Sequence, residues 1–312
     1  MISAGIEQDG RDAAPAAQLR RGVEWPTLAL AIVIYGGWLA ITAWHAHLPG
    51  WCLAILGGWL IAWHGSLQHE TIHGHPTGLR AIDGLLGAVP LSLWLPYRVY
   101  RRTHRAHHAA AHVTNPVEDP ESRYLPPSAG PLATLVARAQ ATLAGRLLLG
   151  PVLTILTFLV AEAGRAWRRP GPVLREWIPH LTGVGAVVLW LDHCGFGLWW
   201  YALTFLYPGP ALSLLRSFAE HRSDAIPGHR IAIVERAGPF ALLFLNNNLH
   251  AAHHAAPGLA WYRLPAFHRR HRARLLADNG GLLYRGYGEV ARRFLLRRHD
   301  RLIHPDPAGL PA

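Results

Sequence analysis

The feature that most restricts the fold of this chain is a long stretch without charge. Between Trp25 and His69 there is no Asp, Glu, Lys or Arg. A membrane-spanning helix needs about 20 apolar residues, so this stretch is long enough for two spans. Residues 47–50 (His-Leu-Pro-Gly) in its middle favour a turn. The sequence therefore predicts a hairpin of two membrane-spanning helices, at Thr27–Trp44 and Trp51–Leu67.

The composition extends this prediction to the whole chain. Hydrophobic residues make up 51% and charged residues only 16%, whereas a soluble protein carries about a quarter charged residues. Two later apolar runs, Trp177–Leu191 and Gly195–Leu215, predict a second hairpin. A run at Gly84–Tyr97 is too short to span and is predicted to be interfacial or re-entrant, and Leu147–Ala161 a membrane-surface helix. The expected fold class is an all-α integral membrane protein with about four transmembrane helices in two hairpins.

The charge pattern predicts the orientation in the membrane. The formal net charge is +11 and every basic side chain is Arg. The Arg clusters lie between and after the apolar runs, which favours cytoplasmic anchoring over binding to nucleic acid. We predict a multi-pass protein of the bacterial inner membrane with both termini in the cytoplasm. Its expected parts are a cytoplasmic tail (1–24), a membrane domain (25–275) and an Arg-rich cytoplasmic segment (276–312).

Histidine is the residue type in which function should be sought, since the chain contains 21. Three short motifs stand out: His69-Glu70-Thr71-Ile72-His73, His104-Arg105-Ala106-His107-His108 and His250-Ala251-Ala252-His253-His254. Residues three or four apart share one face of a helix, so each motif can aim two imidazoles at one metal ion. All three motifs fall at the cytoplasmic edge of the predicted bundle, as a histidine cap. Such a cluster suits iron, zinc or copper.

Two alternatives compete with a pair of metal ions. The first motif matches the helix of zinc proteases, in which two histidines bind zinc and the glutamate activates water. A zinc hydrolase needs three protein ligands, however, and would leave most of these histidines without a role. A non-catalytic metal-binding or transport protein is the other alternative. Eight imidazoles at one depth fit two metal ions better than one.

The three motifs in this order resemble those of the membrane fatty acid desaturase superfamily, which also contains alkane and carotenoid oxygenases. The resemblance covers roughly Trp51 to His271. It is supported by the stretches 73–76 (His-Gly-His-Pro), 95–98 (Leu-Pro-Tyr-Arg), 216–222 (Arg-Ser-Phe-Ala-Glu-His-Arg), 248–250 (Asn-Leu-His) and 261–265 (Trp-Tyr-Arg-Leu-Pro).

The resemblance implies a set of iron ligands and supporting residues. The implied ligands are His69, His73, His104, His107, His108, His250, His253 and His254. Family members place a further ligand before the third motif, where this chain has His221. Acyl-CoA desaturases have Asn where this chain has Ser217. Glu70 and, among three consecutive asparagines, Asn248 are expected to hydrogen-bond to ligand histidines. His64 is turned away from His69 and is expected to be a packed or channel residue.

The implied activity is an O2-dependent oxidation of a lipid-like chain by a centre of two Fe2+ ions. Desaturation of a fatty-acyl chain is the first choice, with hydroxylation or ketone formation by the same superfamily as the alternative. An HExxH zinc membrane hydrolase is the alternative of another class. The chain has two cysteines, too few for a cysteine-ligated iron–sulfur cluster, and no Gly-rich dinucleotide motif. The expected partners are therefore the membrane and an external electron donor, namely a ferredoxin, a rubredoxin-like protein or a flavoprotein reductase.

Overall fold

The computed structural model describes residues 22–305. Most of the predicted cytoplasmic tail, residues 1–21, lies outside this range, as do residues 306–312. The described chain is helical apart from loops and one two-stranded parallel sheet, in which Ile233 pairs with Leu283. The elements are α1 Trp25–Ala43, η2 His45–His47, α2 Gly50–Ile72, α3 Arg80–Ala88, α4 Tyr97–Ala109, α5 Pro131–Ala139, α6 Leu143–Leu148, α7 Gly150–Arg168, α8 Pro170–His193, α9 Leu198–Tyr201, η3 Ala202–Leu206, α10 Pro208–Glu220, η4 Pro227–Arg230, β1 Ile233–Val234, α11 Pro239–Leu243, α12 His250–Ala255, α13 Leu264–Asp278, β2 Leu283–Tyr284 and α14 Tyr287–Phe294.

The first predicted hairpin is present as α1 and α2. Both helices are long and apolar enough to cross a membrane. The short η2 turn and the extended Pro49 lie between them. Helix α2 continues to Ile72, five residues beyond the predicted end of the span at Leu67. This extension carries His69 on the same helix as the span, and His73 follows directly at the end of the helix.

The predicted second hairpin is not a pair of antiparallel spans, and the expected four spans are corrected accordingly. Helix α8 and the helical segment Leu198–Glu220 meet at an angle of 110° and qualify together as at most one broken span or re-entrant loop. Within the described residues, two helices could cross a membrane, or three if this bent pair counts as one. Helix α8 begins at Pro170, before the apolar run that suggested a span, and its first half contains Arg175, Glu176 and Pro179. By itself it is therefore not among the candidate spans of the described residues.

Two shorter predictions are refined by the helix boundaries. The run Leu147–Ala161 lies mostly in α7, a continuous helix in which Pro151 occupies the first turn, where proline is tolerated. The run Gly84–Tyr97 ends α3, continues as an irregular loop and reaches the first residue of α4. Neither segment is among the candidate spans of the described chain.

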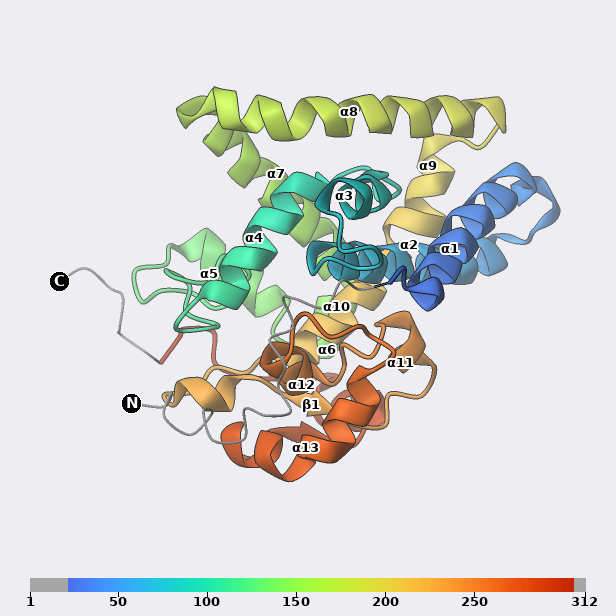
Figure 1. Ribbon diagram of the computed structural model, residues 1–312. Coiled ribbons are helices and arrows are strands. Elements are labelled where there is room, and N and C mark those ends of the chain that lie inside the picture. The colour runs from blue at the N-terminus through green and yellow to red at the C-terminus, as the bar shows by residue number, and fades with distance from the viewer. Residues whose placement is uncertain (1–21, 306–312) are drawn as a thin grey trace.

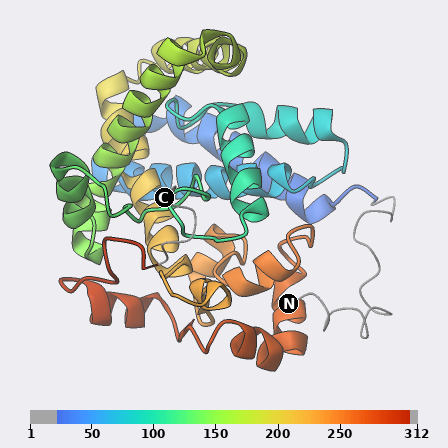
Figure 2. The same cartoon turned by 90° about the vertical axis from the view of Figure 1, so that its left-hand side faces the viewer.

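Helix α2 is the central element, because small residues allow other helices to approach it closely. A Cβ atom at Gly209 would lie 2.5 Å from the Cβ of Ile61, and one at Gly57 would lie 2.6 Å from the Phe205 ring. Any larger residue at Gly57 or Gly209 would therefore push η3 or α10 away from α2. In Figure 1, α8 runs along one side of the molecule and α13 along the opposite side, with α2, α4 and α10 between them. Figure 2 shows the elements after α10 gathered below the N-terminal helices.

Candidate metal centre

The first histidine motif lies at the end of α2. His69 is in the last turn and is buried, and His73 is the residue that follows the helix. The His73 backbone N–H still donates to the carbonyl of Glu70, so the chain keeps a helical course to this point. The four-residue spacing therefore places both rings on one side of α2, as a helix requires.

The second motif lies in the last two turns of α4. His104 and His107 are 4% and 2% exposed, and His108 is half-buried. Helix α4 begins after Pro96 and is anchored to α8 by an ion pair between Arg102 Nε and Glu176 Oε1, at 3.0 Å. These contacts fix the direction in which α4 presents its histidines.

The third motif forms the short helix α12, which begins after a sharp turn. Leu245 and Asn246 both adopt positive φ angles, 49° and 58°. Asn tolerates this left-handed conformation better than most residues, and the Asn246 amide also donates to the Trp261 carbonyl at 3.0 Å. The turn directs His250, His253 and His254 back toward α2 and α4.

The nine predicted ligands come together in two groups. The first group consists of His69, His73, His104, His108 and His253. The His104 Nε2 atom lies 3.1 Å from the Nε2 atoms of both His73 and His108, and His253 Nε2 lies 3.0 Å from that of His108. These rings come from α2, α4 and α12 and from the residue after α2.

The second group consists of His107, His221, His250 and His254. His221 follows α10 in an extended conformation, and its Nε2 atom lies 3.0 Å from that of His250. The Nε2 atoms of His250 and His254 are 3.1 Å apart, and those of His107 and His254 are 3.4 Å apart. His221 is therefore a member of the cluster and not a surface residue between charged neighbours.

These spacings have the dimensions of metal coordination shells. Imidazole nitrogens bind metal at about 2.1 Å, so two ligands at right angles lie about 3.0 Å apart and two at the tetrahedral angle about 3.4 Å apart. Within each group, the candidate ligand atoms all lie within 4.8 Å of one another. Each group can thus hold one ion.

Four of the nine histidines have their Nδ1 atom held by an acceptor group, which determines the tautomer of these four rings. A carboxylate or carbonyl oxygen can only accept, so Nδ1 carries the proton and Nε2 keeps its lone pair for a metal. Lone pairs that face one another at 3.0 Å repel unless a cation lies between them, so the donor set fits bound metal. The pairs are His104 Nδ1 with Glu121 Oε1 (3.2 Å), His107 Nδ1 with Asp119 Oδ1 (2.9 Å), His250 Nδ1 with Asn247 Oδ1 (2.9 Å) and His221 Nδ1 with the Arg230 carbonyl (3.3 Å).

Burial keeps most of these rings neutral. Burial, together with the charges of neighbouring histidines, lowers the pKa of His73 to about 2 and the pKa of His108 and His221 to about 3. Burial also lowers the pKa of the three α12 histidines well below the ordinary value. At His107, burial opposes protonation, but the hydrogen bond to Asp119 together with the charges of Glu121, Asp119 and Glu220 outweighs it, and the pKa is raised. Neutral imidazole is the form that binds metal.

The sequence comparison agrees with this geometry. Residues 44–287 match the fatty acid desaturase family, a range that covers more than half of the chain and includes all nine clustered histidines. The chain belongs to the fatty acid desaturase family. No curated protein matches the sequence.

In this desaturase-family chain, Glu70 lies beside the first ligand group but on its outer side. Its Oε1 atom is 3.7 Å from His69 Nδ1, and Oε2 accepts the Trp261 backbone N–H at 3.2 Å. The carboxylate therefore faces Nδ1 of His69 and a backbone amide, and it does not face the converging Nε2 atoms.

The asparagine beside the cluster is Asn247 and not Asn248, which corrects the expectation from the sequence. Asn247 Oδ1 accepts from His250 Nδ1 at 2.9 Å, and its Nδ2 lies 3.4 Å from His69 Nε2. Asn248 points the other way, and its Nδ2 donates to the Val234 carbonyl at 2.7 Å. The left-handed turn at Asn246 decides this, because it sets which of the next two side chains faces the histidines. The sequence has three consecutive asparagines and no local signal that distinguishes them.

The acidic loop after α4 supplies two carboxylates that sequence reasoning missed. Asp119 accepts from the backbone N–H groups of Thr114 and Glu121, both at 2.8 Å, in addition to its contact with His107. Their only signal in the sequence is the acidic stretch Glu118-Asp119-Pro120-Glu121 shortly after the second motif. The prolines nearby indicate a loop, but they do not show where the loop packs.

The C-terminal segment holds this loop in place. Asp300 Oδ2 accepts from the Tyr124 hydroxyl at 2.8 Å and from the Ser223 backbone N–H at 2.7 Å. Arg123 donates to the His221 carbonyl at 2.9 Å and contacts His299 Nδ1 at 2.7 Å. A segment distant in sequence thus connects the acidic loop with the residue that contributes to the second group.

Two cavities lie on the side of the histidines that faces the spans. The inner cavity, about 210 Å³, runs between α2 and α10 and is lined by Gln68, which precedes His69, and by Tyr100, whose ring centroid is 5.7 Å from that of His104. Ser217, where acyl-CoA desaturases have Asn, also lines it. The inner cavity therefore approaches the first ligand group through Tyr100, although none of the nine clustered histidines lines it.

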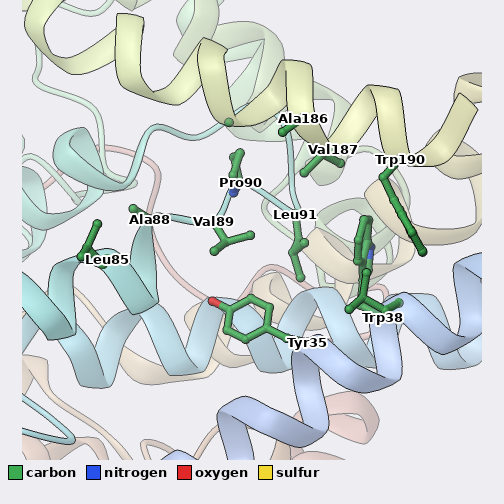
Figure 3. Close-up of a pocket in the computed structure, with 12 residues that line it drawn as sticks. Tyr35, Trp38, Leu85, Ala88, Val89, Pro90, Leu91, Ala186, Val187 and Trp190 are labelled. Carbon is green, nitrogen blue, oxygen red and sulfur yellow. The ribbon is translucent and has the colours of Figure 1, made fainter. Parts of the chain in front are cut away.

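The outer cavity, about 500 Å³, is almost entirely apolar and contains no clustered histidine. Figure 3 shows Tyr35 and Trp38 of α1 facing Val187 and Trp190 of α8, with Leu91 between them. Since α1 is a candidate membrane span, the outer cavity lies where lipid chains would be its neighbours.

Proposed function

We propose that this protein is an O2-dependent di-iron oxidoreductase that removes two hydrogens from a lipid-like chain to form a double bond. The observation that carries the proposal is the pair of histidine groups, each made of buried or half-buried, mostly neutral imidazoles whose ligand atoms lie within 4.8 Å of one another. The same ligands could support hydroxylation or ketone formation on the same class of substrate.

A pair of iron ions bound to the nine histidines would supply the capacity to reduce O2. In the balanced desaturation, the chain loses two hydrogens and O2 is reduced to two waters, with two electrons and two protons supplied from outside. The residues of this chain perform the remaining tasks. The imidazoles bind the ions, Asp119, Glu121 and Asn247 orient their rings, and the inner cavity holds the chain and excludes bulk water.

The orientation of Glu70 favours this proposal over a zinc hydrolase. In a hydrolase the glutamate must reach a water bound on the Nε2 side of the two histidines. Glu70 instead accepts from the Trp261 backbone and faces Nδ1 of His69. A single zinc ion would also leave one of the two histidine groups without a metal.

Electrons would come from a ferredoxin, a rubredoxin-like protein or a flavoprotein reductase. Helix α13 carries exposed Arg269, Arg270 and Arg274, which suit the docking of an acidic carrier. We place this face, the histidine groups and both termini on the cytoplasmic side of a bacterial inner membrane, because the Arg clusters favour that side. The cytoplasmic ends of the spans would then face the electron carrier, and the apolar middle of each span would face lipid.

The deciding experiment is metal and lipid analysis of wild-type protein and single-histidine variants. We expect about two irons per chain in the wild type. A host that expresses the gene should contain an unsaturated lipid that is absent without it. His108→Ala and His254→Ala, one from each group, should each lower the iron content and abolish the product. Exposed His193 should tolerate the same change.

Each other result points to a different conclusion. An alcohol or ketone as the only new product would establish oxygen insertion instead of desaturation. One zinc per chain with peptide cleavage would establish the hydrolase. Full turnover in both His108→Ala and His254→Ala would remove the metal centre from the mechanism.

A further inference from the structure

The inner cavity contains a buried histidine that is outside both ligand groups. His64 is 1% exposed, lines the cavity, and has no hydrogen-bond partner on either ring nitrogen among the described residues. A weak contact with the nearby Val89 backbone would still leave the second nitrogen without a partner. An unpaired polar group buried in protein costs on the order of 1–3 kcal/mol, so its presence calls for an explanation.

A second unpaired group lines the same cavity. The Trp94 indole Nε1 is buried without a hydrogen-bond partner in residues 22–305, although its ring packs against Phe158. Indole N–H can only donate, and a neutral imidazole has one N–H as well. The indole therefore needs an acceptor, whereas the unpaired His64 nitrogen donates or accepts according to its tautomer. A ligand oxygen that accepts from the indole, such as a hydroxyl that can also donate to His64, suits both groups.

The size of the cavities indicates how the rest of such a ligand is accommodated. The inner cavity, about 210 Å³, is smaller than a usual small-molecule site of about 300–1,000 Å³. The outer cavity adjoins it through a thin wall. His64 lines the inner side and Tyr35 the outer side, with ring centroids 5.7 Å apart, and the consecutive residues Leu91 and Ser92 line one cavity each. A ligand with its polar end inside and an apolar chain extending outward therefore has to pass the wall formed at His64 and Tyr35.

We propose that His64 and Trp94 form a binding site for an oxygen function of the substrate, whose apolar remainder occupies the outer cavity. The substrate class is then a lipid bearing a hydroxyl or carbonyl oxygen, and a plain hydrocarbon is excluded. His64 and His69 are five residues apart on α2, which is about 7.5 Å along the helix axis. The oxygen function is therefore bound more than one helical turn away from the ligand His69.

The test measures binding of two probes that differ only in the hydroxyl group. The interpretation of the ligand as a substrate rests on the proposed function, but the binding measurement itself does not require turnover. Iron-loaded protein in detergent is incubated with equal amounts of dodecan-1-ol and dodecane, separated from free probe, and the retained probe is quantified by gas chromatography. Wild type should retain the alcohol about three- to tenfold better than the alkane, the range expected for one or two hydrogen bonds.

His64→Phe and Trp94→Phe should each lose most of this preference while still retaining dodecane. The matched controls are His47→Phe and Trp199→Phe, because both residues are exposed and neither lines a cavity. Both should keep the wild-type preference. Equal retention of the two probes by wild type, or an unchanged preference in His64→Phe and Trp94→Phe, would overturn the proposal.

Iron measured on the same samples separates this proposal from the previous one. A wild type with two irons and no alcohol preference would disprove the oxygen site and leave the oxidoreductase in place. A wild type with a clear alcohol preference and no iron-binding capacity would disprove the oxidoreductase and leave the binding site in place.

Discussion

Replacing Asn247 with alanine should weaken iron binding, whereas the same replacement at Asn248 should leave iron binding unchanged. The two residues are adjacent and identical in type, and each is 2% exposed. They differ in their contacts. Asn247 accepts from His250 Nδ1 at 2.9 Å, whereas Asn248 donates to the Val234 carbonyl at 2.7 Å. Comparing the two variants therefore distinguishes a residue that orients a ligand histidine from a residue that only stabilises the fold.

The expected magnitudes follow from these contacts. Removing a group that orients a ligand histidine costs about 10–100-fold in metal affinity, which is about 1.4–2.8 kcal/mol. Asn248→Ala leaves a buried carbonyl without its donor, which costs about 1–3 kcal/mol of stability. Asn247→Ala should thus shift iron release, and Asn248→Ala should lower the unfolding temperature at equal iron content.

The assay is dialysis of purified wild type and both variants against a graded series of iron chelator, followed by iron analysis and thermal unfolding. Asn247→Ala should lose half of its iron at a chelator concentration about 10–100-fold lower than wild type requires. If Asn248→Ala released iron as easily as Asn247→Ala, the assignment of the orienting role to Asn247 would be refuted.

Three further predictions test other parts of the site. His221→Ala should lower iron toward one per chain, whereas His229→Ala, outside both ligand groups, should bind iron normally; equal iron in the two would remove His221 from the site. Burial lowers the pKa of His299 to about 2. Below about pH 6.5 this histidine is therefore protonated in the unfolded chain but not in the folded protein, so the free energy of unfolding falls as the pH falls. Between pH 7 and pH 5, the free energy of unfolding should therefore fall by about 2 kcal/mol less in His299→Phe than in wild type. An equal fall in both proteins, measured by thermal unfolding, would contradict the reasoning. Asp300→Ala removes the acceptor that holds the acidic loop and should lower iron affinity in the chelator assay, while exposed Arg301 serves as the control; equal affinity in both would show that the C-terminal segment does not support the site.

The first hairpin could be predicted because hydrophobicity and length decide it locally. A stretch without charge from Trp25 to His69 has few alternatives to two spans with a turn. The second hairpin failed because its two runs are interrupted. Helix α8 carries charges and proline in its first half, and the chain bends by 110° between α8 and the segment Leu198–Glu220. The bend is not visible in an average of hydrophobicity along the chain.

The clustered histidines were accessible from sequence for a different reason. Spacings of three and four residues place side chains on one helical face whatever the tertiary structure. His221 lacks such a partner within its own segment and was identified only through the family resemblance. The structure brings it to His250, with 3.0 Å between their Nε2 atoms.

The amino-acid sequence by itself determined that this chain forms helices in a membrane and that its histidine motifs can bind metal, because both properties follow from local periodicity. Only the tertiary structure decided how nine histidines divide into two groups, which asparagine supports them, and which loop supplies Asp119 and Glu121. These contacts join residues far apart in the chain. Their geometry depends on the packing of α2, α4, α10 and α12 together, and no local pattern encodes that packing.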